Sequence, residues 1–140
     1  MNRLRSSLLL LALSAVAACG DNNSPNEAVA GTYHATSAVF TPTGGQPIDA
    51  LALGTSLEIV LTAQGTTTGT LVVPAVLSED GVNEDVIDLA GTYTRTGNTL
   101  TFQGEGDSFI TDVVWTVGNE TLTATDTQLA GTFAVTLTRS

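Results

Sequence analysis

Few side chains in this sequence are suited to nucleophilic or metal-dependent chemistry. The chain has one cysteine, Cys19, and one histidine, His34, and its four basic residues are all arginines. A nucleophile activated by a neighbouring base therefore lacks partners, and a zinc site lacks further nitrogen or sulfur ligands. We expect His34 to be an exposed polar residue on a strand. The sequence thus predicts a protein that is not an enzyme and that uses no cofactor.

The acidic segment 78–88 is a candidate for cation binding. It contains Asp80, Asn83 and Asp85 close to Gly81. Carboxylate and amide oxygens around a glycine turn are ligands that Ca²⁺ uses, although the spacing differs from that of an EF-hand loop. Two interpretations stay open: a weak calcium site at these three residues and, favoured, a solvated acidic loop with no metal.

Cys19 ends a segment with the features of an export signal. Residues 1–5 carry two arginines, and an apolar run over residues 8–18 follows that is shorter than the roughly 20 residues a membrane-spanning helix needs. The tetrad Val16-Ala17-Ala18-Cys19 resembles the bacterial lipobox, in which the cysteine receives a diacylglyceryl thioether. We expect a bacterial lipoprotein that loses its signal peptide, residues 1–18, and is held on a membrane by acyl chains. A plain secretory leader with an incidental cysteine is the alternative.

The residues after the cysteine bear on location. Residues 20–26 are polar and contain a proline, which is typical of a spacer, so residues 19–28 are expected to form the lipidated cysteine and a flexible tether. In enterobacterial sorting an aspartate directly after the cysteine favours the inner membrane, whereas here that residue is Gly20. We therefore expect a lipid anchor in the cell envelope, with the outer membrane favoured, facing the periplasm or the cell surface.

The charge balance argues against anionic partners. The net charge is −10, and with two of the arginines in the leader only Arg95 and Arg139 face 14 acidic residues. No basic cluster is available to neutralise phosphates, so nucleic-acid binding is not expected. Repulsion from anionic headgroups should also hold the domain away from the membrane surface on its tether.

Residues 29–140 show the alternation of a β-domain. Threonines alternate with aliphatic or aromatic residues, a period of two that is typical of half-buried strands. In the last run, for example, Phe133, Val135 and Leu137 share one face. The expected strands cover residues 31–40, 55–63, 68–73, 89–96, 98–103, 109–117, 120–125 and 131–138.

Glycine-asparagine pairs connect some of these strands. Gly97-Asn98 and Gly118-Asn119 are suited to tight hairpins, because glycine tolerates a positive φ. Consecutive hairpins predict an all-β, antiparallel, up-and-down meander. Closure into a barrel of about eight strands would remove the free edges of such a sheet.

The pattern resembles the lipocalin-like domains of bacterial lipoproteins over roughly residues 29–139. The matching features are the opening Gly31-Thr32-Tyr33, the hairpin at 91–101 and an arginine at the end of the last strand. In lipocalins the opening is Gly-x-Trp, and that arginine packs over the tryptophan to close the barrel. The resemblance implies that Tyr33 and Arg139 occupy these two positions.

The resemblance also implies a cup whose interior holds a small apolar ligand. A barrel of about eight strands is just wide enough either to be filled by its own side chains or to hold one small molecule, and the large inward residues favour a partly or wholly filled core. The candidate ligand-lining residues are Tyr33, Leu57, Ile59, Phe102, Trp115 and Phe133.

The loop over residues 41–54 corresponds to the loop that covers the mouth of lipocalins. It is either a lid whose Ile48, Leu51 and Leu53 touch a ligand or, favoured, a loop that packs its own apolar residues on the barrel rim. The leading hypothesis is a non-enzymatic, lipid-anchored barrel that binds a small apolar molecule or envelope lipid. The alternative is a structural or interaction module whose filled barrel contacts another envelope protein of unknown identity.

Overall fold

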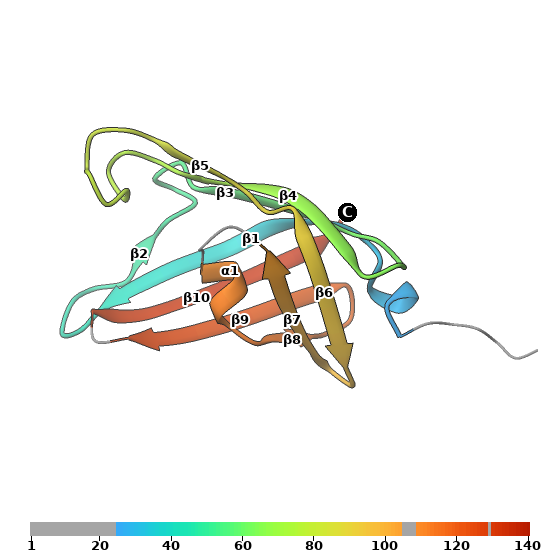
Figure 1. The fold of residues 1–140 in the computed structure, drawn as a ribbon. Helices are drawn as coiled ribbons and strands as arrows, with labels where there is room; N and C mark the ends of the chain where they lie inside the picture. The colour runs from blue at the N-terminus through green and yellow to red at the C-terminus, as the bar shows by residue number, and fades with distance from the viewer. Residues whose placement is uncertain (1–24, 105–108, 129) are drawn as a thin grey trace, which may run out of the picture.

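The computed structural model describes residues 25–104, 109–128 and 130–140, which fold into a closed antiparallel barrel of eight strands with two further strands outside it (Figure 1). The predicted all-β barrel is therefore confirmed. The strands are β1 (Gly31–Pro42), β2 (Ile48–Asp49), β3 (Ser56–Leu61), β4 (Thr66–Val73), β5 (Asp85–Asp88), β6 (Gly91–Thr96), β7 (Thr99–Gly104), β8 (Trp115–Val117), β9 (Thr121–Gln128) and β10 (Gly131–Arg139). Two short helices accompany them, the 3-10 helix η1 (Glu27–Val29) and α1 (Phe109–Asp112).

The barrel is an up-and-down meander. Its strands follow the order β1, β3, β4, β6, β7, β8, β9 and β10, and β10 pairs again with β1 to close the ring. The closing ladder runs from Tyr33 opposite Arg139 to Pro42 opposite Gly131, with an irregularity between Ala35 and Ser37. Both additional strands pair with barrel strands, β2 with β1 and β5 with β4.

Strand β4 divides its pairing between two neighbours. Its first residues pair with β6 at Thr66 and Thr67, and its later residues, from Thr70 to Val73, pair with β5. The layer of β3, β4 and β5 therefore diverges from β6 and extends over β1 and β10 (Figure 1). One end of the barrel is consequently wider than the other.

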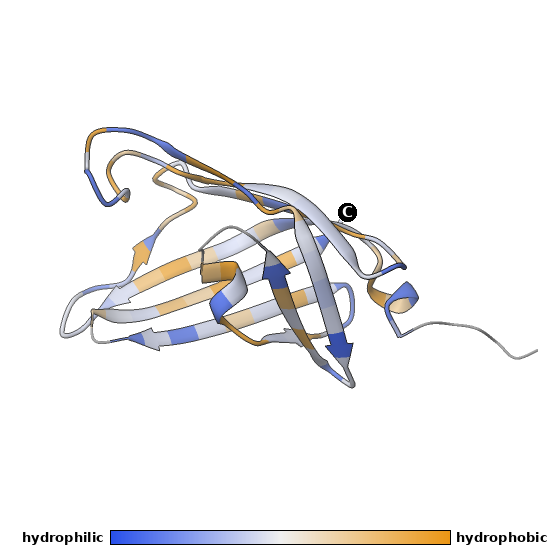
Figure 2. Ribbon diagram, viewed as in Figure 1, coloured by the Kyte–Doolittle hydropathy of each residue, from blue (hydrophilic) through white to orange (hydrophobic). Residues whose placement is uncertain are grey.

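Apolar side chains point inward from every part of the ring. Figure 2 shows hydrophobic and hydrophilic positions alternating along the barrel strands, the pattern on which the strand predictions were based. Trp115 is fully buried, contacts Phe102 edge-on at 6.0 Å between ring centroids, and donates its indole hydrogen to the Ile110 carbonyl oxygen at 3.2 Å. The other fully buried large residues include Ile59, Leu100, Leu122 and Leu137.

The strand predicted over residues 109–117 is wrong in its first half. Residues 109–112 form the helical turn α1, and only Trp115–Val117 is a strand. Phe109 and Val113 lie four residues apart, a spacing that places side chains on one face in a strand and in a helix alike. The sequence pattern was therefore compatible with either structure.

The two predicted hairpins differ from each other. Gly97 and Asn98 form a two-residue loop between β6 and β7, with Gly97 at φ +60°, as expected. The loop between β8 and β9 is one residue longer. Its residue with a positive φ is Glu120, at 58°, and not Gly118 as the sequence suggested. The carboxylate of Glu120 accepts a hydrogen bond from Arg139 at 2.7 Å, which contributes to holding this turn.

We predict that Gly69→Ala destabilises the barrel, because the backbones of β3 and β4 approach closely at this position. A Cβ on Gly69 would collide with the Glu58 carbonyl oxygen and lie 2.9 Å from the Ile59 Cα. The expected loss is about 1–3 kcal/mol of unfolding free energy, measured by urea denaturation. Thr68→Val, on the exposed face of the same strand, is the control and should change the value by less than about 0.5 kcal/mol. Equal effects of the two substitutions would contradict the close approach.

Candidate functional site

The narrow end of the barrel is sealed by η1 and the last residue of β10. Arg139 crosses this end, and a Cβ on Gly31 would lie 2.7 Å from the Arg139 Cδ, so the guanidinium stem packs directly on the glycine. Its Nη1 donates to the carbonyl oxygens of Ala28 and Ala30, both at 3.3 Å. The hydrogen bond from Arg139 to Glu120 raises the arginine pKa further and keeps the group charged. Tyr33, which pairs with Arg139, is buried beside it.

Two tyrosines join η1 and its approach to the barrel. The Tyr33 hydroxyl donates to the Val29 carbonyl oxygen at 3.0 Å, and the Tyr93 hydroxyl lies 2.6 Å from the Thr62 carbonyl oxygen and 3.3 Å from that of Asn26, directly before η1. Arg95 donates to the Pro25 carbonyl oxygen at 2.8 Å. Within the described ranges, both arginines therefore lie at the sealed end.

The tyrosines give a prediction for alkaline unfolding. Burial raises the pKa of Tyr33 and of Tyr93 above the ordinary value of 10.0. Their contribution to stability is fully present below pH 10, and it is lost as the pH rises through the folded-state pKa, since the unfolded chain releases these protons first. We expect Y33F/Y93F to show a shallower fall in urea midpoint above pH 10 than the parent protein. At pH 7 the double variant should be less stable by about 1–3 kcal/mol per lost buried hydrogen bond. An unchanged alkaline slope would show that these hydroxyls do not titrate as argued.

The wide end contains a cavity of about 350 Å³. Its wall is apolar apart from Thr55, and it is built by both sides of the barrel, by β2 and by α1. The lining from the closing strands consists of Ala35, Ala38, Phe40, Phe133 and Val135. The opposite wall and the rim consist of Ile48, Ala50, Thr55, Leu57, Leu71, Val73, Leu77, Phe109 and Ile110.

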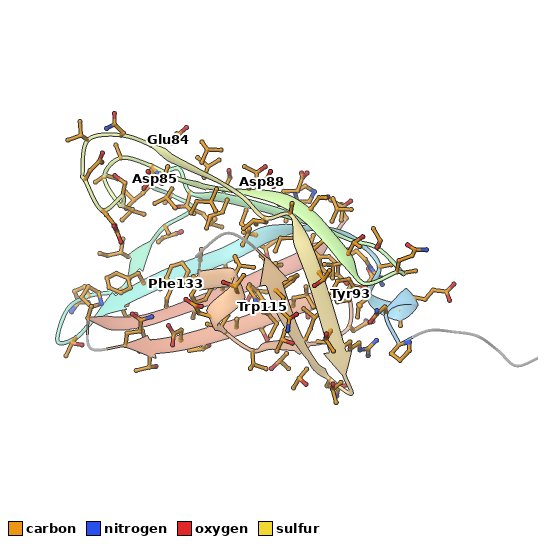
Figure 3. The ribbon with its side chains drawn as sticks, in the orientation of Figure 1. Glu84, Asp85, Asp88, Tyr93, Trp115 and Phe133 are labelled. Atoms are coloured by element: carbon orange, nitrogen blue, oxygen red, sulfur yellow. The ribbon has the colours of Figure 1, made fainter. Side chains whose placement is uncertain are left out.

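The cavity begins where the large core residues end. Figure 3 shows Phe133 at the wide end, Tyr93 at the sealed end and Trp115 between them. Phe109 of α1 contacts Trp115 edge-on at 6.2 Å and Phe133 at 4.7 Å between ring centroids, so it connects the packed core to the cavity wall, to which both phenylalanines belong. On β1, Ala35 and Ala38 lie between Tyr33 at the sealed end and Phe40, which pairs with Phe133, and their small side chains leave room.

The six predicted lining residues separate into two groups. Leu57 and Phe133 line the cavity. The other four lie in the packed core, each no more than 4% exposed: Tyr33, Ile59, Phe102 and Trp115. Residues that sequence reasoning missed include Ala38, Leu71 and Ile110. Strict alternation would place Ala38 on the outer face with His34, and the irregularity in the ladder between Ala35 and Ser37 turns it inward, so the sequence carried no signal for this position.

The segment 41–54 folds back along the barrel at the wide end. Ile48 of β2 pairs with Phe40 of β1 and lines the cavity. Leu51 lies instead on a shallow outer depression beside Glu58, and the Leu53 side chain is exposed. Of the three predicted lid residues, one therefore reaches the cavity wall.

The acidic segment forms a self-contained turn. The Asp80 carboxylate accepts hydrogen bonds from the backbone of Asn83 at 2.9 Å, from the backbone of Val82 at 2.8 Å and from the Ser78 hydroxyl at 2.9 Å. These bonds, with that to the Asn83 backbone first, hold the Asp80 pKa well below its usual range. Asp85 lies apart in β5, and no cluster of three histidine, cysteine, aspartate or glutamate side chains occurs in the described ranges. The oxygens of Asp80 thus accept hydrogen bonds within the turn itself.

Other predicted features are placed as follows. His34 lies 3.3 Å from Glu58, and both side chains are about half exposed, so the pair contributes little to stability. Cys19, the lipobox and residues 1–18 lie outside the described residues. Neither helix in the described part of the chain has the length and apolar character needed to span a bilayer.

Fold and site together define a small β-barrel protein with an apolar cavity at its wide end. Comparison of the chain with protein-family models, curated proteins and solved structures gives no match. The features of this chain that bear on function are therefore the barrel, its cavity and the sequence of the N-terminal segment.

Proposed function

We propose that this protein is a lipid-anchored bacterial envelope protein that binds a small apolar molecule or lipid inside its barrel without transforming it. The observation that carries the proposal is the cavity of about 350 Å³ at the wide end. Ligand sites in proteins range from roughly 300 to 1,000 Å³ and are lined mainly by apolar side chains. The volume therefore suits a small ligand, such as a short alkyl chain or a compact ring system.

The size of the cavity distinguishes it from an ordinary packing defect. Protein interiors contain few voids larger than a water molecule, and unfilled apolar space costs roughly 24 cal/mol per Å³. In this chain the half of the barrel around Trp115 is filled, whereas the wide half contains Ala35, Ala38 and Ala50. A ligand in this space would regain the contacts that the alanines leave unmade.

The sealed end supports the resemblance to lipocalin-like domains. Arg139 of the last strand packs on Gly31 and pairs with Tyr33, so it lies at the opening motif, and η1 leads directly into that motif. Tyr33 occupies the position of the lipocalin tryptophan and donates a hydrogen bond within the seal. Because these contacts close the sealed end, a ligand would enter the cavity from the wide end.

The proposed lipid anchor is supported by the N-terminal sequence. The tetrad Val16-Ala17-Ala18-Cys19 directly follows the apolar run, and Cys19 is the only cysteine in the chain. A thioether-linked diacylglyceryl group supplies two acyl chains, which together give stable membrane attachment. Gly20 favours the outer membrane as the location.

Ligand binding is tested by filling the cavity. Leu71 lines it from β4, while Thr68 points outward from the same strand and is exposed. We expect Leu71→Trp to weaken binding of the neutral fluorophore N-phenyl-1-naphthylamine by about tenfold or more, because the indole occupies the space. Thr68→Trp should leave binding within about twofold of the parent, a range of roughly 0.4 kcal/mol. Folding of each variant is checked by circular dichroism.

Absence of probe uptake by the folded parent protein would contradict ligand binding. That result would favour the structural or interaction module, in which the barrel surface contacts another envelope protein. Equal loss of binding in both tryptophan variants would show that the probe binds elsewhere.

The anchor is tested by metabolic labelling with an alkyne analogue of palmitate in a bacterial host. We expect the full chain to incorporate the label and to fractionate with membranes. Cys19→Ser should abolish incorporation and release the protein from the membrane fraction, since no other thiol is present. Label retained in the variant, or a soluble unlabelled parent, would contradict the lipoprotein assignment.

A further inference from the structure

The inward-facing rows of two strands end in carboxylates, each of which lies opposite a residue of the cavity wall without itself lining the cavity. On β5, Ile87 is partly buried against the core, and Asp85 lies two residues away on the same face. Asp85 pairs with Val73, which lines the cavity, and residues opposite each other in a ladder share a face. Figure 3 shows Asp85 at the wide end of the molecule. Asp85 is exposed, and its place in the ladder puts it on the cavity side of the sheet.

Strand β9 provides the second carboxylate. Its inward row consists of Leu122 and Ala124, both buried, followed by Asp126, which is half-buried. Asp126 pairs with Phe133 of β10, and Phe133 lines the cavity. The Gln128 amide donates to the Asp126 carboxylate at 2.6 Å. An ionisable group thus occupies an inward position that the periodicity of the strand otherwise assigns to an apolar residue.

The basic side chains in the described part of the chain lie away from Asp85 and Asp126. Arg95 and Arg139 both lie at the sealed end, where their guanidinium groups are bonded to backbone carbonyl oxygens. His34 lies on the outer face of β1 beside Glu58. An anionic head group at the rim would therefore meet two carboxylates and no cation, while the whole chain carries a net charge of −10.

We propose that the cavity selects amphiphiles with a cationic head, of which an alkyl ammonium is the simplest, and that Asp85 and Asp126 are the residues that provide this selection. The alkyl part lies in the apolar cavity and the ammonium lies at the rim between the two strands. An alkyl carboxylate of the same length is disfavoured by like-charge repulsion. This inference rests on the proposed function, since it concerns the ligand of the same cavity.

The experiment compares three ligands that differ only in the head group. Octylammonium, octanol and octanoate are titrated against the protein loaded with N-phenyl-1-naphthylamine, at pH 7 and low ionic strength. We expect octylammonium to displace the probe at about tenfold lower concentration than octanoate, with octanol between them. Raising the salt concentration should reduce this difference, because the rim is open to solvent and its charges are screened.

Matched double variants assign the selection to the rim. D85N/D126N removes the two inward carboxylates, and D49N/E84Q removes two negative charges outside the inward rows. Asp49 lies between Ile48 and Ala50, which line the cavity, and so faces away from it. The ratio of octanoate to octylammonium displacement should fall at least threefold in D85N/D126N and stay within about twofold of the parent in D49N/E84Q.

The outcomes separate this inference from the proposed function. Probe uptake by all three proteins establishes that each is folded with an accessible cavity. Equal displacement by the three ligands, tighter octanoate, or the same change in both double variants would overturn cationic selection and leave ligand binding in place. Failure of the parent protein to take up the probe would instead overturn the proposed function itself.

Discussion

The antiparallel ladder between β1 and β10 is the interaction on which the rest of the structure depends. It joins the first and last strands of the domain, from Tyr33 opposite Arg139 to Pro42 opposite Gly131, and so turns an open meander into a ring. Closure pairs two edges that would otherwise expose backbone hydrogen-bonding groups, and it creates an interior separate from solvent. The same ladder also fixes the polarity of the barrel, because one of its ends carries the arginine seal and the other carries the aromatic wall of the cavity.

Unequal filling of this ring accounts for how one small barrel has both a core and a ligand-sized space. Around Trp115, aromatic and branched side chains meet edge to face and leave little volume. Toward the wide end the chain contributes alanines from β1, and β4 leaves its barrel neighbour β6 to pair with β5. Side-chain size and strand divergence therefore act together. Burial of apolar side chains around Trp115 therefore stabilises the barrel, whereas the wide end around the cavity contributes less.

Strand periodicity predicted much of the fold, because alternating threonine and apolar residues leave one face for the core. It failed at residues 109–112, where Phe109 and Val113 share a face in a helix as well as in a strand. The cavity was less predictable. Trp115 and Phe133 are both large inward aromatic residues, and only the register between strands distinguishes a core position from a wall position. The role of Ala38 was likewise hidden, because the irregularity between Ala35 and Ser37 reverses the alternation of β1 and brings inward a residue that periodicity places outside.

The chain enters the barrel at its sealed end, and this bears on how an anchored molecule would be oriented. Pro25, the first described residue, is tied to Arg95 at the sealed end, whereas Phe133 and the cavity lie at the far end of the barrel. Five residues lie between Cys19 and Pro25, which gives a covalent reach of at most about 22 Å. A bilayer holding the protein at Cys19 would therefore lie nearest the floor of the cup, with its opening turned outward. Cargo would then be exchanged with the aqueous compartment or with a facing surface, and not drawn directly from the supporting leaflet.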